Sequence, residues 1–129
     1  MSTRGAIGMR QPDGSVRAVY VHHDAYVAGV GAILGGWYDS PEKVEALLDL
    51  GDLSSLGTTL AGTVAYHRDR GEVMRIARRY RDIDVYRRNG TSDFEADYLY
   101  LYDGGRWLVY GIPNEPDWVE INVTVNMEK

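Results

Sequence analysis

Apolar and polar residues alternate with period two in the first and last thirds of the chain, which is the pattern of half-buried β-strands. Early on, "RGAIGMRQ" and "VRAVYVHHD" flank "PDGS", and an Asp-Gly pair between apolar runs favours a tight hairpin turn. Later, "DYLYLY" and "RWLVYGI" flank "DGG" in the same way, and "WVEINVTV" continues the alternation. We therefore expect two β-hairpins and a further strand at 118–125.

Two stretches after the first hairpin have helical patterns instead. Apolar residues repeat at helical spacing over 27–37, and the glycines inside this stretch indicate a close approach to the sheet. The next helix has the clearest boundaries, because Ser40 suits an N-cap, Pro41 fits the first turn and Gly51 is a C-terminal signal. The residues from 52 to 62 are small and polar, and we expect a connection there.

The middle of the chain is harder to interpret. "TVAYH" predicts a short strand, and "GEVMRIARRYRDI" predicts a helix over 71–83 with an apolar stripe and an arginine-rich outer surface. In "DVYRRNGTSDFEA", Asn89-Gly90 is typical of a turn and "DVYRR" of a short strand. Together the elements predict one α+β domain over 1–129, with a mostly antiparallel sheet built from hairpins and two or three helices on one face.

The composition narrows the class of protein. A chain of 129 residues is long enough to bury a core, and the lack of cysteine excludes disulfides, thiolate metal sites and cysteine catalysis. No apolar run reaches the length of a membrane span, so we expect no membrane partner. The first residues lack the apolar region of a secretory signal, and we expect a cytoplasmic location.

The charge is bipolar although the net charge is only −5. Eight arginines face four acidic residues over 67–88, whereas eight acidic residues outnumber two basic ones from Asn89 onward. The acidic excess argues against broad nucleic-acid binding, and the arginine cluster is either a local anion site or a solvated helix face. The bipolarity also permits self-association. The candidate partner-binding arginines are Arg75, Arg78, Arg79 and Arg81.

All three histidines lie in "YVHHDAY" (20–26) and "YHRDRGE" (66–72), which hold two His-x-Asp pairs, His22 with Asp24 and His67 with Asp69. If the pairs converge, two imidazoles and two carboxylates suit a divalent metal that activates water, with Arg68 or Arg70 holding a phosphate. The structural alternative is that each histidine bonds its own aspartate and each aspartate accepts backbone N–H groups. In that case we expect no cofactor.

Tyrosine is the dominant aromatic residue, with ten copies beside one phenylalanine. Tyr98, Tyr100 and Tyr102 share one face of their strand because side chains alternate. The stripe is either an exposed contact surface, as tyrosine favours interfaces, or it packs beneath a helix. We count these tyrosines among the candidate partner-binding residues.

The sequence resembles a group of small proteins encoded by bacteriophages, prophages and actinobacterial genomes. The shared patterns are "MSTR" followed by "IG", then "DGSV", "Y-x-H-x-D-x-Y", "LGDLSSLG", "TVAYHRDRGE" and a hairpin like "YLYLYDGGRWLVY". The match covers about the first 72 residues and that hairpin. It implies a mobile-element context rather than a reaction.

The resemblance can be followed residue by residue. This chain departs from the group at Val21, where the group has Cys, at His23, where it has Trp, and at Ala25, where it has Gly. A cysteine nucleophile is therefore not offered here, and Ala25 predicts a turn without positive φ. The matching positions are Arg4, Asp13, Gly14, Tyr20, His22, Asp24, Tyr26, His67, Arg68, Asp69 and Gly71.

These observations favour a non-enzymatic binding protein of a phage or mobile element, acting on a host or phage macromolecule in host takeover or counter-defence. A protein partner is expected ahead of nucleic acid. The first alternative is a metal-dependent phosphodiesterase or nuclease that uses the two His-x-Asp pairs. The second alternative is a nucleotide-binding sponge in which Arg68, Arg70 and a tyrosine hold phosphate and base.

Overall fold

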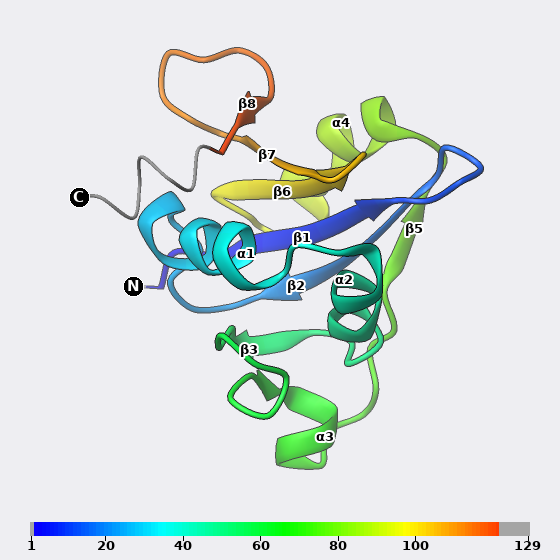
Figure 1. Ribbon diagram of the computed structural model, residues 1–129, viewed down its shortest axis with the longest axis vertical. Coiled ribbons are helices and arrows are strands. Elements are labelled where there is room, and N and C mark those ends of the chain that lie inside the picture. Colours follow the sequence, from blue (N-terminus) through cyan, green and yellow to red (C-terminus); the bar gives the residue numbers. More distant parts are fainter. Residues whose placement is uncertain (1, 122–129) are drawn as a thin grey trace.

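A computed structural model describes residues 2–121, which form a single α+β domain around one mixed, mostly antiparallel sheet (Figure 1). The strands follow the order β4-β3-β2-β1-β6-β7-β8, and β5 pairs with β2 beside that path. The predicted fold class is therefore confirmed. The strands are β1 (Gly5–Arg10), β2 (Val16–Val21), β3 (Leu53–Ser55), β4 (Val64–Ala65), β5 (Arg78–Tyr80), β6 (Tyr98–Asp103), β7 (Arg106–Tyr110) and β8 (Val119–Glu120).

Both predicted hairpins are confirmed. β1 and β2 are antiparallel, and in the turn between them the Asp13 carboxylate accepts the Ser15 N–H at 2.9 Å while Gly14 has φ +89°. β6 and β7 are antiparallel across the turn at Gly104-Gly105. β1 and β6 lie parallel at the centre of the sheet, so residues from both hairpins form the core. β8 confirms only the start of the strand predicted at 118–125, and residues 122–125 lie outside the described part.

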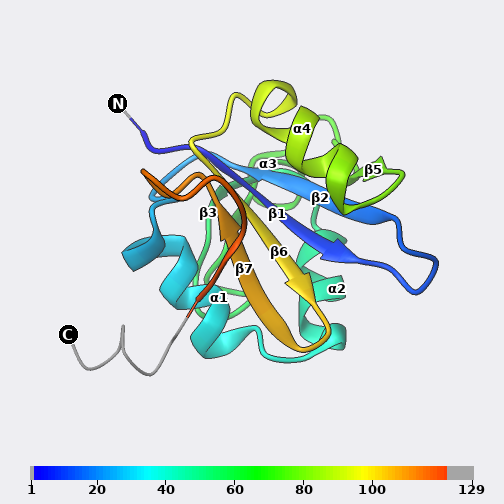
Figure 2. The same cartoon turned by 90° about the horizontal axis from the view of Figure 1, so that it is seen from above.

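Helices cover both faces of the sheet, not one face as predicted (Figure 2). One face carries the π-helical turn η1 (Val27–Gly31), α1 (Ala32–Trp37) and α2 (Pro41–Leu48). The other face carries α4 (Ile83–Asp93). The reason is that the central strands are apolar on both sides, as β6 shows by placing Tyr100 in one core cluster and Leu101 in the other.

The helices at 27–37 and 41–48 confirm their sequence signals. A Cβ on Gly31 would lie 3.3 Å from the Tyr100 ring, so the glycine permits the predicted close approach. The Ser40 side chain accepts the Lys43 N–H and caps α2. Ala25 was expected to mark a turn without positive φ, but the preceding residue, Asp24, has φ +59°. Nowhere in residues 2–121 is a helix long and apolar enough to cross a membrane.

The turn and strand predicted within 84–96 are wrong, because this segment is α4. The Asp82 carboxylate caps the helix by accepting the Val85 N–H at 2.9 Å, and Tyr86 is fully buried against the sheet. A Cβ on Gly90 would lie 3.1 Å from Leu99, so this glycine serves close packing and not a turn. Tertiary packing thus outweighs the Asn-Gly turn signal.

The helix predicted over 71–83 is also wrong. α3 (Tyr66–Arg70) ends at Gly71, which has φ +66°, and 71–77 then run without regular structure into β5. The edge of β2 takes Arg78, Arg79 and Tyr80 as a pairing strand, which a helix would not allow. Leu53–Ser55, predicted as part of a polar connection, forms β3, and the strand predicted in "TVAYH" is confirmed only at β4.

Candidate functional site

A cleft of about 450 Å³ lies at the edge of the sheet where β3 and β5 diverge. Both strands pair with the same edge of β2, β3 at Val21 and β5 over Val16–Ala18, and they leave a gap between them. Aromatic and charged residues from several elements line this cleft, among them Tyr20, Asp52, Tyr66, His67, Arg75 and Arg78.

Asp52 fills the gap in the sheet. Its Oδ1 accepts the Tyr20 N–H at 3.0 Å, its own N–H donates to Arg75 O at 3.2 Å, and its carbonyl accepts the Tyr66 N–H at 3.2 Å. Burial raises the pKa of this carboxyl, and the Tyr20 N–H, Arg78 and Arg75 oppose that rise. Its second oxygen makes no hydrogen bond to residues 2–121 and is therefore free toward the cleft.

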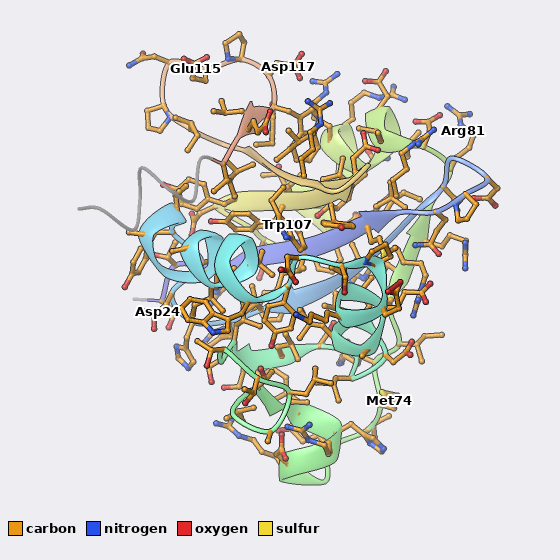
Figure 3. All side chains as sticks on the ribbon, viewed as in Figure 1. Asp24, Met74, Arg81, Trp107, Glu115 and Asp117 are labelled. Atoms are coloured by element: carbon orange, nitrogen blue, oxygen red, sulfur yellow. The ribbon has the colours of Figure 1, made fainter. Side chains whose placement is uncertain are left out.

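We define residues 72–79 as the arginine strap, which descends along one side of the cleft and includes the start of β5. Met74, near the middle of the strap, is labelled in Figure 3. In the described part of the chain eight basic side chains make ion pairs, and the five that make none are Arg70, Arg75, Arg78, Arg79 and Arg88. Among those eight is Arg81, which pairs with Asp82 at 3.1 Å.

Hydrogen bonds to neighbouring segments nevertheless fix the positions of Arg78 and Arg79. Arg78 donates to the Asp93 carbonyl at 3.1 Å, and its guanidinium carbon lies 4.8 Å from the centre of the Phe94 ring. Arg79 donates to Ser15 Oγ at 3.0 Å. These contacts use neutral acceptors and a ring, so the positive charges stay available to an anionic partner.

The histidines are held by neighbours other than their aspartates. His22 Nδ1 lies 2.7 Å from the Tyr20 hydroxyl, and burial, with His23, Arg4 and Arg70 nearby, lowers the pKa of its imidazole. His67 Nδ1 lies 2.8 Å from Glu72 O. Because a carbonyl oxygen only accepts, His67 carries a proton on Nδ1. This hydrogen bond joins α3 to Glu72, the first residue of the strap.

The four residues of the two His-x-Asp pairs do not form one site. Asp69 accepts the Ala65 N–H at 2.8 Å and binds the Arg68 guanidinium with both oxygens, while Asp24 is exposed. Across residues 2–121 no group of three or more histidine, aspartate or glutamate side chains is placed to hold a metal ion. The two stretches do meet at the cleft, but through Tyr20 and His67.

The arginines beside Asp69 have different surroundings. Arg68 donates to the carbonyls of Leu60 and Thr63 as well as to Asp69, so it ties the loop before β4 to α3. Arg70 lies over the Tyr66 ring at 5.4 Å. Arg68 is thus fully engaged in the fold, and only Arg70 of the two predicted anion-binding residues has its guanidinium free of carboxylates.

The predicted contact stripe of tyrosines is wrong for two of its three members. Tyr100 is fully buried and donates its hydroxyl proton to Ala25 O, and Tyr102 is buried 5.2 Å from the Trp107 ring. Tyr98 is half-buried and packs against the same cluster. The stripe therefore packs beneath η1 and α1, which was the other outcome considered.

Several cleft residues were not singled out from the sequence, above all Asp52 and Phe94. Asp52 contacts Tyr20 and Phe94 contacts Arg78, and both partners are distant along the chain. No local sequence pattern therefore predicts that Asp52 and Phe94 belong to the cleft. Comparison with models of protein families, with curated proteins and with solved structures found no match. The fold and site define a small α+β protein with a charged cleft at a sheet edge.

Proposed function

We propose that this protein is a non-enzymatic binding protein that captures an acidic segment of a partner protein on the arginine strap. The observation that carries the proposal is that three of the five basic side chains without a carboxylate partner in residues 2–121, Arg75, Arg78 and Arg79, lie together on the strap. Unpaired arginines on one exposed segment attract negative charge and speed association.

The apolar residues of the strap favour a protein over a nucleic acid. Val73 is 87% exposed and Ile76 is 77% exposed, although both are aliphatic, and Met74 lies between them. Protein interfaces are enriched in arginine and methionine, and exposed apolar groups commonly mark them. Proteins that bind single-stranded nucleic acid stack its bases on aromatic side chains, and residues 72–79 of the strap contain none.

The expected partner is a host or phage protein in the bacterial cytoplasm. The resemblance of the N-terminal patterns to phage and prophage proteins supports this context, as does the small single domain. Host takeover or counter-defence are the roles that we propose for such a capture.

Charge reversal tests the surface directly. The tagged protein and an Arg75→Glu/Arg79→Glu variant are used to capture proteins from host lysate, with and without nuclease, at low and high salt. The matched control is Arg88→Glu/Arg106→Glu, which makes the same charge change on α4 and at the β6–β7 turn. We expect a salt-sensitive, nuclease-resistant partner that the control retains and the strap variant loses.

Two outcomes contradict the proposal. Capture that is unchanged in the strap variant excludes the strap as the contact surface. A retained species that disappears after nuclease treatment makes the ligand a nucleic acid. Circular dichroism of both variants checks that each is folded, which is expected because all four side chains are at the surface.

A further inference from the structure

The cleft is lined by oppositely charged side chains that do not form an ion pair with each other. Asp52 lines the cleft, and Arg75 and Arg78 line it from the strap. Arg75 is joined to Asp52 through its backbone carbonyl, so the two residues are neighbours. Neither arginine makes an ion pair with Asp52 or with any other carboxylate of the described residues.

Because these side chains do not pair, hydrogen-bonding groups remain unused on Asp52 and on the arginines, and we call the space between them the gap. Asp52 has one oxygen without a hydrogen bond to residues 2–121, while Oδ1 is occupied by the Tyr20 N–H. The His67 ring uses Nδ1–H on Glu72 O, which leaves its other nitrogen, Nε2, for a further hydrogen bond. Arg75 has all its guanidinium protons free of protein acceptors in the described part.

The rest of the lining is mixed: it includes Arg4 and Glu95, which pair with each other at 3.1 Å, and the acidic residues Glu72 and Asp93, beside aromatic and apolar residues. Tyr20, Tyr66 and Phe94 line the cleft, and Val73 lies at its rim. Arg78 lies over the Phe94 ring and Arg70 over the Tyr66 ring, while Tyr20 and Tyr66 are half-buried and expose part of their surface. The volume of about 450 Å³ has room for a small organic molecule.

We propose that the cleft binds a free α-amino acid with an aromatic or apolar side chain. Its ammonium group donates to the free oxygen of Asp52, its carboxylate bridges to Arg75 and Arg78, and its side chain packs on Tyr20 and Tyr66. An α-amino acid carries its ammonium and carboxylate groups on the same carbon, so one small molecule can bond to Asp52 and to the arginines at once, and charge-assisted bonds of this kind are the strong ones. The site shares Arg75 and Arg78 with the surface that we propose for a protein partner, whereas Arg79 does not line the cleft and belongs to that surface alone.

Isothermal titration and thermal-shift measurements with the individual proteinogenic L-amino acids test the site. We expect stabilisation by an aromatic or apolar amino acid, and none by its N-acetyl derivative or its carboxamide, because each lacks one of the two charges. Adenosine monophosphate is the comparison ligand, because it carries an anion and an aromatic ring but no ammonium group for Asp52.

The decisive variant is Asp52→Asn, which retains an oxygen for the Tyr20 N–H but places an NH₂ group where the free oxygen was. We expect it to fold and to weaken amino-acid binding by about tenfold or more, as loss of a hydrogen bond to a charged group does. Glu115→Gln, the same change on the loop far from the cleft in Figure 3, is the matched control and should bind normally.

The outcomes separate this inference from the proposed function. Arg79→Glu should lose the protein partner and keep the amino acid, whereas Asp52→Asn should do the reverse. The inference is overturned if no amino acid binds, if the N-acetyl derivative binds as well as the parent, if adenosine monophosphate alone binds, or if Asp52→Asn binds like the wild type.

Discussion

The carboxylate of Asp52 accepts the backbone N–H of Tyr20 at 3.0 Å, in place of the strand that is missing between β3 and β5. A side chain thus completes a sheet ladder, and the same residue fixes the strap through Arg75 O and α3 through the Tyr66 N–H. The cleft exists because one residue joins three segments that are distant in sequence.

Removal of this carboxylate should destabilise the protein, and its neutral replacement should not. Asp52→Ala leaves the Tyr20 N–H without an acceptor, and we expect a loss of about 1–3 kcal/mol in the free energy of unfolding. Asp52→Asn keeps an acceptor and should lie within about 1 kcal/mol of the wild type. Urea unfolding of both variants measures this, and equal losses would show that the Tyr20 bond contributes little.

The pKa of Asp52 gives this comparison a pH dependence. Because burial raises the folded-state pKa above the ordinary value of about 4, the unfolded chain loses its proton first as pH rises. The contribution of Asp52 to the stability of the wild type should therefore fall from about pH 4 up to the raised pKa and then level off. Asp52→Asn cannot ionise, so its stability relative to wild type should grow over the same window. A constant difference between the two unfolding curves from acid to neutral pH would argue against the raised pKa.

Gly8 makes room for the buried ring of Tyr86. A Cβ at position 8 would lie 3.1 Å from three atoms of that ring, whose hydroxyl donates to Tyr100 O at 2.9 Å. We expect Gly8→Ala to cost about 1–3 kcal/mol in unfolding free energy, because α4 must move from the sheet. Gly36→Ala is the control, since Gly36 lies in α1 with open space around it and alanine favours a helix. Thermal unfolding should show a loss for the first variant and none for the second.

Gly51 allows the strap to pass close to the end of α2. It has φ +77°, and a Cβ there would lie 2.5 Å from Arg75 O and 2.8 Å from Met74 Sδ. We expect Gly51→Ala to displace the strap and to expose 72–77 to limited proteolysis. Gly104→Ala, with φ +62° and no neighbour within contact distance, shares the backbone strain but not the clash. If both variants gave the same cleavage pattern, strain alone would explain the result.

Local signals in the sequence determined the elements whose stabilising residues are neighbours in the chain. Asp13-Gly14 and Gly104-Gly105 specify their hairpins, and Ser40 with Pro41 specifies the start of α2. In each case the turn or cap bonds form within a few residues, so their chemistry can be read directly. An equally local bond marks the start of α4, where the Asp82 carboxylate accepts the Val85 N–H, but our prediction for this segment rested on the Asn-Gly pair instead.

Only the tertiary structure decided what the arginine-rich segment becomes and where the site lies. An apolar stripe in 71–83 predicted a helix, yet the free edge of β2 binds Arg78–Tyr80 as a strand and leaves Val73 and Ile76 in solvent. The pairing of Asp52 with Tyr20 spans 32 residues, and that of Arg78 with Asp93 depends on where α4 ends. Such contacts follow from which sheet edges and helix ends meet in space, and no periodicity of the chain encodes that.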